Sequence, residues 1–110
     1  MPETALPPVL AAVDLGSNSF HLLVARVAGD DFQVLDQIKT PVRLAAGLDK
    51  RGRLSPAARA RALECLHLFG ERVRDLPHGA VRAVGTNTFR RAHNAGPFVA
   101  AAAAALGHPI

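Results

Sequence analysis

The sequence predicts an α/β domain with a mixed β-sheet, built in the order three strands, helix, strand, helix. Two short apolar runs are typical of buried strands: Val9–Val13, which is continuous and predicts burial on both faces, and Ala80–Val84, which is interrupted by Arg82. Two further segments rich in β-forming residues flank a tight turn, which predicts an antiparallel hairpin. A helix lies between this hairpin and the second apolar run, and such a crossover favours a parallel pairing of that run with an earlier strand.

The composition fits one globular domain. The chain has 110 residues, of which 49% are hydrophobic and 20% charged, so a wholly disordered chain is excluded. A single cysteine, Cys65, rules out an internal disulfide, and no apolar stretch approaches the ~18 residues of a membrane span. The first residues lack the pattern of a signal peptide. We therefore expect a cytoplasmic protein without membrane contact.

The net charge of +4 is weak evidence for nucleic-acid binding, because the arginines are scattered from Arg26 to Arg91. The phenylalanines are not interleaved with them as a base-stacking surface requires. The distribution of the acidic residues is more informative, because none of the nine follows Asp75. The segment after Asp75 therefore offers no carboxylate side chain for catalysis.

The strands follow a proline-containing segment, residues 1–8, which we interpret as a flexible N-terminal tail before the domain at residues 9–110. The first strand ends at Asp14. The second and third are expected at Phe20–Val27 and Phe32–Lys39, joined by a hairpin turn at 28–31.

The first helix has clear start signals, with Ser55 as N-cap and Pro56 at the first helical position. Its apolar residues recur at spacings of three and four, which predicts one buried stripe: Ala58, Ala62, Cys65, Leu66, Phe69 and Val73. The polar residues expected to face water are Arg59, Arg61, Glu71, Arg72 and Arg74.

The segment after the fourth strand is expected to hold a short helical turn at Phe89–His93 and then a second helix. Pro97 opens that helix, alanines at 100–105 continue it, and Leu106–Pro109 ends it. Because a further strand would naturally begin where the chain stops, we expect this to be part of a longer protein.

The turn after the first strand, Asp14-Leu15-Gly16-Ser17-Asn18-Ser19-Phe20, is the sharpest local feature. Gly16 permits close approach of the backbone to a ligand, and Ser17 and Ser19 offer hydroxyl groups. The carboxylate of Asp14 is placed to hold Mg²⁺ directly or through water. The alternative is an ordinary hairpin turn with polar residues.

A second polar turn, Gly85-Thr86-Asn87-Thr88-Phe89-Arg90-Arg91, follows the fourth strand. Thr86 and Thr88 can donate hydrogen bonds, and a guanidinium can bind phosphate with two parallel bonds. The alternative is a plain helix cap with both arginines in solvent. If the first and fourth strands are parallel neighbours, both turns open on the same edge of the sheet.

These two turns carry a family resemblance. The strings VDLGSNSFHLLVARV at 13–27 and VGTNTFRRAHN at 84–94, with QIKTPVRLAAGLD between them, resemble the N-terminal portion of the exopolyphosphatase / guanosine pentaphosphate phosphohydrolase (Ppx/GppA phosphatase) family. The resemblance covers about residues 9–108. It implies a ribonuclease-H-like fold of the actin-like ATPase superfamily, of which this chain would be the N-terminal half-domain.

The activity implied by this resemblance is Mg²⁺-dependent hydrolysis of a phosphoanhydride. It would release the terminal phosphate of inorganic polyphosphate or the 5′ γ-phosphate of guanosine pentaphosphate. In this family the position of Asp14 serves the metal. The phosphate-binding positions carried over are Gly16, Ser17, Asn18, Ser19, Thr86, Asn87, Thr88 and Arg90, whereas Arg91 is expected to be exposed.

The resemblance places no catalytic residue within this chain. The family's general base, a glutamate, and its second phosphate loop are expected beyond Ile110, in a missing C-terminal half that is the main implied partner. The 110-residue piece is therefore expected to be inactive alone. A homodimer of the full-length protein is compatible with this interpretation.

Two other functions stay open. An ATP-binding kinase-like protein of the same superfamily would share the acid–glycine turn, and a non-catalytic phosphate-binding module would fit the missing base. Polyphosphate and guanosine pentaphosphate are not distinguished. We interpret His21 and His67 as packed or partly exposed residues and Cys65 as a small hydrophobic one, so all three stay outside the candidate site.

Overall fold

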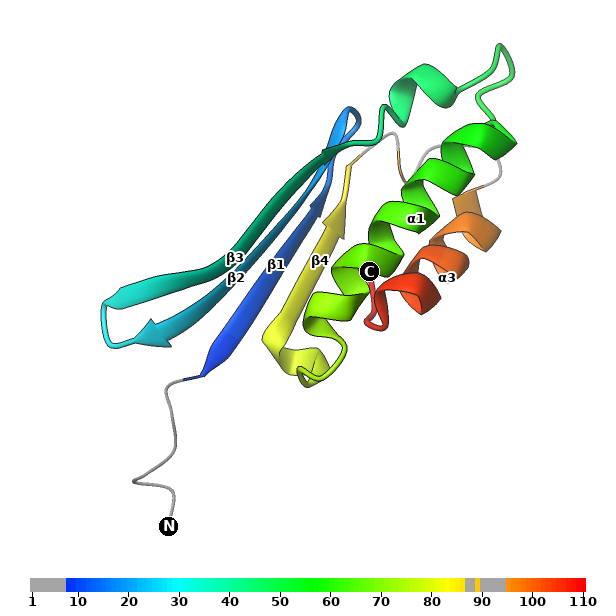
Figure 1. Cartoon of the computed structure of the whole chain (residues 1–110). Coiled ribbons are helices and arrows are strands. Elements are labelled where there is room, and N and C mark those ends of the chain that lie inside the picture. Colours follow the sequence, from blue (N-terminus) through cyan, green and yellow to red (C-terminus); the bar gives the residue numbers. More distant parts are fainter. Residues whose placement is uncertain (1–7, 87–88, 90–94) are drawn as a thin grey trace.

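The four expected strands pair into one sheet in the computed structural model, which describes residues 8–86, 89 and 95–110 (Figure 1). The sheet order is β3-β2-β1-β4. The strands are β1 (Val9–Leu15), β2 (Ser19–Ala28), β3 (Asp31–Pro41) and β4 (Val81–Gly85). β1 lies between β2, antiparallel to it, and β4, parallel to it, which confirms the predicted mixed topology.

The ends of β1 and β4 differ from the expectation. β1 continues to Leu15, so Asp14 lies inside the strand rather than at its end. Gly85 extends β4 instead of breaking it, because it pairs with Leu15. β4 begins at Val81, one residue later than expected. Ala80 belongs instead to a 3-10 turn, η3 (His78–Ala80), in which the Ala80 N–H donates to the carbonyl of Pro77.

The hairpin between β2 and β3 forms as predicted. Ala28 pairs with Asp31, and Gly29 adopts a φ of 60° while Asp30 does not have a positive φ. This is the pattern of a type II′ turn, in which glycine takes the first central position at no steric cost. Further along, the register shifts by one position, and Leu35 is the extra residue of a bulge in β3.

The long helix α1 (Pro56–Val73) begins where the capping signals predict, with the Ser55 hydroxyl accepting a hydrogen bond from the Ala58 N–H at 3.1 Å. All six residues of the predicted stripe are buried. Arg59 was expected in water but is half-buried, and its Nε has no hydrogen-bond partner among the described residues. The reason is its position four residues before Leu63, on the side of α1 that continues to Gly70 and faces the second helix.

The second helix, α3 (Ala95–Leu106), starts two residues before Pro97 and ends as predicted, at Gly107 with a φ of 84°. α1 and α3 approach closely at Gly70, where an added Cβ would lie 2.6 Å from the carbonyl oxygen of Ala105. Of the expected helical turn at Phe89–His93 only Phe89 is described, and it is helical. The rest of that turn, and residues 1–7 of the expected tail, lie outside the described residues.

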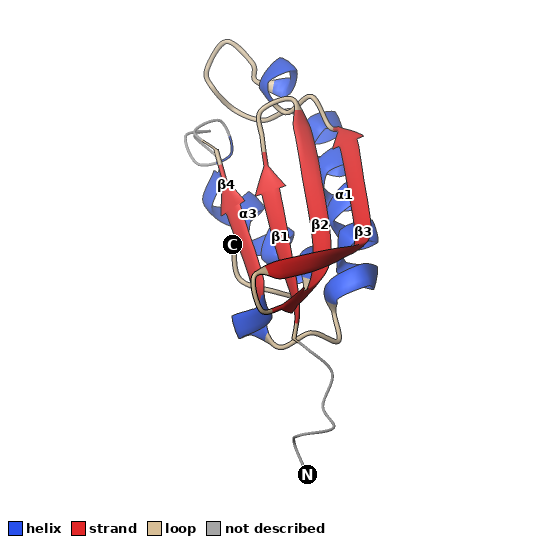
Figure 2. Cartoon of the chain, turned by 90° about the vertical axis from the view of Figure 1, so that its left-hand side faces the viewer, coloured by secondary structure: helices blue, strands red, loops and turns tan. Residues whose placement is uncertain are grey.

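Both helices cover the same face of the sheet, as Figure 2 shows. The prediction that β1 is buried on both faces is therefore wrong. Its residues alternate, with Val13 and Leu15 buried under the helices and Leu10 43% exposed on the opposite face. Every other apolar side chain of β1 thus lies on a face that no described element covers; we call it the open face.

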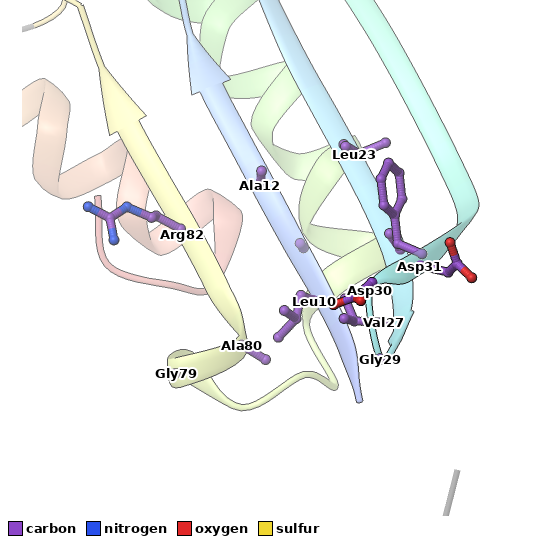
Figure 3. A pocket seen from close by; sticks show the side chains of 13 residues that line it. Leu10, Ala12, Leu23, Val27, Gly29, Asp30, Asp31, Gly79, Ala80 and Arg82 are labelled. Atoms are coloured by element: carbon purple, nitrogen blue, oxygen red, sulfur yellow. The ribbon is translucent and has the colours of Figure 1, made fainter. Parts of the chain in front are cut away.

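The lower half of the open face is apolar. A hollow of about 450 Å³ lies there. Its lining includes Leu10, Ala12, Leu23 and Val27, with Arg82 from β4 at one side (Figure 3). The upper half, toward the carboxyl ends of β1 and β4, carries polar residues and leads to the two turns.

Candidate functional site

The two polar turns meet at the carboxyl edge of the sheet. Because Leu15 pairs with Gly85 in the parallel ladder, the chain leaves both strands at the same height. The Thr86 N–H donates to the carbonyl of Leu15 at 3.1 Å, and the hydroxyl oxygens of Ser17 and Thr86 lie 3.4 Å apart. This confirms that the two turns open on one edge, which is where ligands gather in α/β sheets.

The first turn is closed by its own backbone. The Gly16 N–H donates to the carbonyl of Ser19 at 3.0 Å, and a Cβ on Gly16 would lie 2.8 Å from that oxygen. Glycine is therefore required by the close approach of two backbone segments. Because the Gly16 N–H is already hydrogen-bonded within the turn, the contribution of Gly16 is to the shape of the site.

The segment that follows β3 is hydrogen-bonded to the same turn through two backbone N–H groups. The Arg43 N–H donates to the carbonyl of Asn18 at 2.8 Å, and the Ala45 N–H donates to that of Ser17 at 2.9 Å. Both acceptors are thus fixed, and the turn keeps one shape. The only sequence signal was the position of this segment within the family-like string QIKTPVRLAAGLD.

Asp14 lies on the open face, exposed, in a row of cross-strand neighbours. Val84 of β4 is on one side of it, and His21 of β2 and then Lys39 of β3 follow on the other. Directly opposed residues share a sheet face, so a carboxylate, an imidazole and an ammonium group stand side by side below the turn. The structure thus adds exposed His21 and Lys39 to the surroundings of Asp14.

The second turn is anchored to the core by its aromatic residue. A Cβ on Gly85 would lie 2.6 Å from the Phe89 ring, and that ring packs against Phe20 and Phe98 with centroid separations of 6.5 and 5.1 Å. The other expected site residues of this motif, Asn87, Thr88 and Arg90, lie outside the described residues, and so does Arg91, which is expected to be exposed. Their expected roles are untested by the geometry.

Within the described ranges, no three His, Cys, Asp or Glu side chains gather in a way that could hold a metal ion. Asp14 contributes one carboxylate, with the Ser17 and Thr86 hydroxyls at the same edge. This oxygen set fits Mg²⁺, which keeps several waters and takes one or two carboxylates together with substrate phosphates.

Cys65 and His67 stay outside the site, as the sequence suggested. Cys65 is buried in the core, and burial raises the pKa of its thiol, while a hydrogen bond to Thr40 lowers it in part. His67 is exposed on α1. None of the helices in the described part of the chain has the length and apolar character that a membrane crossing requires.

The fold and the site together define an α/β domain with a mixed sheet and a polar edge where two strands end side by side. The model of the Ppx/GppA phosphatase family matches residues 23–110 of the chain. This protein therefore belongs to the Ppx/GppA phosphatase family.

Curated relatives are similar along the whole chain. It is 51% identical over 110 residues to a guanosine-5′-triphosphate,3′-diphosphate pyrophosphatase of Vibrio cholerae serotype O1, and 49% identical to one of Vibrio atlanticus. The match covers 100% of this chain and 22% of each relative. The chain thus spans about a fifth of their length.

Solved structures support the expected fold. The Aquifex aeolicus PPX-GPPA enzyme matches with a TM-score of 0.78 at 24% identity, over 94% of this chain and 36% of that one. An exopolyphosphatase from Cytophaga hutchinsonii matches with a TM-score of 0.78 at 25% identity, over 93% of this chain and 33% of that one. The chain has the fold of the N-terminal part of these actin-like ATPase-type proteins.

Proposed function

We propose that this chain forms the phosphate-binding half of an active site that hydrolyses a terminal phosphoanhydride bond. The substrate class is guanosine pentaphosphate or inorganic polyphosphate. The Vibrio cholerae relative is named for the first activity and the Cytophaga protein for the second. The observation that carries the proposal is the contact between Ser17 and Thr86, which joins the two family motifs above Asp14.

The hydroxyls of Ser17 and Thr86 are near enough to bind neighbouring oxygens of one phosphoryl group. We assign the rest of the phosphate contacts to Asn18, Ser19, Asn87, Thr88 and Arg90. A guanidinium at Arg90 would bind the phosphate through two parallel hydrogen bonds, a geometry that lysine cannot reproduce.

Asp14 would hold Mg²⁺ from the open face. When bound, the ion would neutralise charge on the phosphate oxygens. Asp14 is the one carboxylate of either motif, and its exposed position one residue before the end of β1 suits a cation that substrate phosphates also bind.

The base that activates the attacking water is assigned to a glutamate outside this chain. No acidic residue follows Asp75 in the sequence, and the only carboxylate in the two motifs is engaged by the metal in this scheme. A water molecule needs a base within hydrogen-bond reach to be oriented and deprotonated.

The test is phosphate release by the longest natural polypeptide that carries this sequence. Guanosine pentaphosphate and inorganic tripolyphosphate are supplied separately, with and without Mg²⁺. We expect free phosphate from at least one of them, with Mg²⁺ required. Transfer of phosphate to an acceptor instead would indicate a kinase, and binding without turnover would indicate a phosphate-binding module; either result would overturn the proposal.

A further inference from the structure

Arg43 has a backbone conformation that normally belongs to glycine. Its φ is 54°, and among the described residues it is the only residue other than glycine with a positive φ. Side chains of L-residues are strained in this region. The conformation persists because the Arg43 N–H donates to Asn18 at 2.8 Å while its carbonyl accepts a bond from Arg61 at 3.3 Å.

Arg61 reaches from α1 to hold this bend. Its Nε donates to the carbonyl of Val42 at 3.0 Å, and its Nη2 donates to that of Arg43. Two successive carbonyls are therefore bound by one guanidinium. All the hydrogen bonds that hold the Arg43 backbone use main-chain atoms of residue 43, so they would remain if its side chain were removed.

Arg43 lines a hollow beside the first turn. The hollow has a volume of about 510 Å³ and is lined by Pro41, Arg43, Ala46 and Arg61. Pro41 pairs with Ser19 in the sheet, and Arg43 is bonded to Asn18. The wall of the hollow is thus directly attached to two of the residues assigned to phosphate.

The hollow is positively charged. Its two guanidinium groups have no carboxylate partner within 4.0 Å in the part of the chain that the structure describes, whereas Arg72 of the same helix pairs with Asp36. Glu64 lies near Arg61 in a neighbouring hollow without forming an ion pair. An extended anion bound at the first turn would find the Arg43 charge available next to it.

We propose that Arg43 is a substrate-binding residue, whose guanidinium binds the phosphoryl groups that follow the terminal one in a chain of three or more phosphates. This inference rests on the proposed function and extends its substrate site. A glycine would adopt the same backbone without strain and keep the same main-chain hydrogen bonds. The presence of a strained arginine at this position is explained if its side chain binds the ligand.

The experiment compares Arg43→Gly and Arg43→Lys with the unchanged longest natural polypeptide, using inorganic tripolyphosphate as the probe. Arg74→Ala is the control, since Arg74 is an exposed arginine at the C-cap of α1. Thermal unfolding and steady-state kinetics are measured for each protein. For Arg43→Gly we expect an equal or higher Tm, a KM raised about ten-fold and a kcat within about two-fold of the unchanged protein.

Arg43→Lys should keep most of the affinity, with a KM within about three-fold, because a point charge still attracts phosphate. Arg74→Ala should match the unchanged protein. An unchanged KM in Arg43→Gly would overturn the inference, and so would a lower Tm, which would indicate a structural role. If the unchanged polypeptide releases phosphate from neither tripolyphosphate nor guanosine pentaphosphate, the proposed function itself fails and this inference falls with it.

Discussion

At the scale of single residues, the first turn depends on a glycine that has no room for a side chain. In Gly16→Ala the new Cβ would meet the Ser19 carbonyl oxygen at 2.8 Å, and this atom belongs to the backbone and cannot rotate away. We expect a loss of about 1–3 kcal/mol in the free energy of unfolding, measured with urea. Gly79→Ala, where the Cβ meets nothing within 4 Å, is the control. Equal stability of the two variants would contradict this account of the turn.

The second motif offers a residue-scale test of substrate contact. In the helical turn that the sequence predicts at 89–93, adjacent residues would point about 100° apart, so only one of Arg90 and Arg91 would face the phosphates. In the longest natural polypeptide, Arg90→Ala should lower kcat/KM by about ten- to a thousand-fold, and Arg91→Ala should cost much less. Equal, small losses on tripolyphosphate would mean that this segment is a solvated cap.

The two turns and their meeting at one edge are predictable from the sequence, because both turns follow apolar runs joined by a helical crossover. The pairing of His21 with Lys39 is not. Counting outward from the Gly29–Asp30 turn pairs His21 with Ile38, whereas the bulge at Leu35 shifts the register by one. No residue propensity in the sequence indicates a bulge at this position. The strained backbone of Arg43 was equally hidden, since its hydrogen bonds depend on residues distant in sequence.

At the scale of elements, the contact of α1 with α3 is set by one glycine. In Gly70→Ala the Cβ would lie 2.6 Å from the Ala105 carbonyl oxygen, so α3 must move away from α1. Despite the better helix propensity of alanine, we expect a loss of about 1–3 kcal/mol of stability by urea unfolding. Gly96→Ala in α3 meets nothing and should be neutral or stabilising. A gain of stability in both variants would refute the close packing.

The buried thiol of Cys65 on α1 should make the free energy of unfolding depend on pH. Burial raises the pKa of Cys65 above its ordinary value of 9.0, so the folded protein keeps the thiol protonated where the unfolded chain ionises. The stability linked to this shift is fully present below pH 9.0 and is lost as the pH rises through the higher pKa of the folded state. Above pH 9.0 the free energy of unfolding should fall more steeply with pH than it does in Cys65→Ala. Parallel pH profiles of the two proteins would show that the thiol is not linked to folding.

The helices were the best predicted elements, because Ser55, Pro56 and the spacing of the apolar stripe act locally. The burial of the strands was predicted poorly. A continuous apolar run such as Val9–Val13 resembles a strand covered on both sides, yet the partner elements decide what is covered. Here both described helices lie on one face.

At the scale of the whole molecule, the described part of the chain contains the two turns that we propose as one side of a phosphate site, and an open face whose lower half is apolar. Leu10 and Phe32 on that face are 43% and 64% exposed. The 110-residue chain alone should release no phosphate from tripolyphosphate, because the assigned base is not among its residues. Multiple turnovers by the purified 110-residue chain would contradict this assignment of the base.

In the proposed site Asp14 serves a cation beside the phosphates that the two turns bind. The decisive measurement is Mg²⁺-dependent phosphate release from guanosine pentaphosphate and tripolyphosphate by the longest natural polypeptide that carries Asp14→Asn. Asp30→Asn, in the distant hairpin turn, is the matched control. We expect Asp14→Asn to lose most of the activity with unchanged thermal unfolding, and Asp30→Asn to keep the activity. Turnover in Asp14→Asn equal to that of the unchanged protein at the same Mg²⁺ concentration would show that Asp14 does not serve the cation.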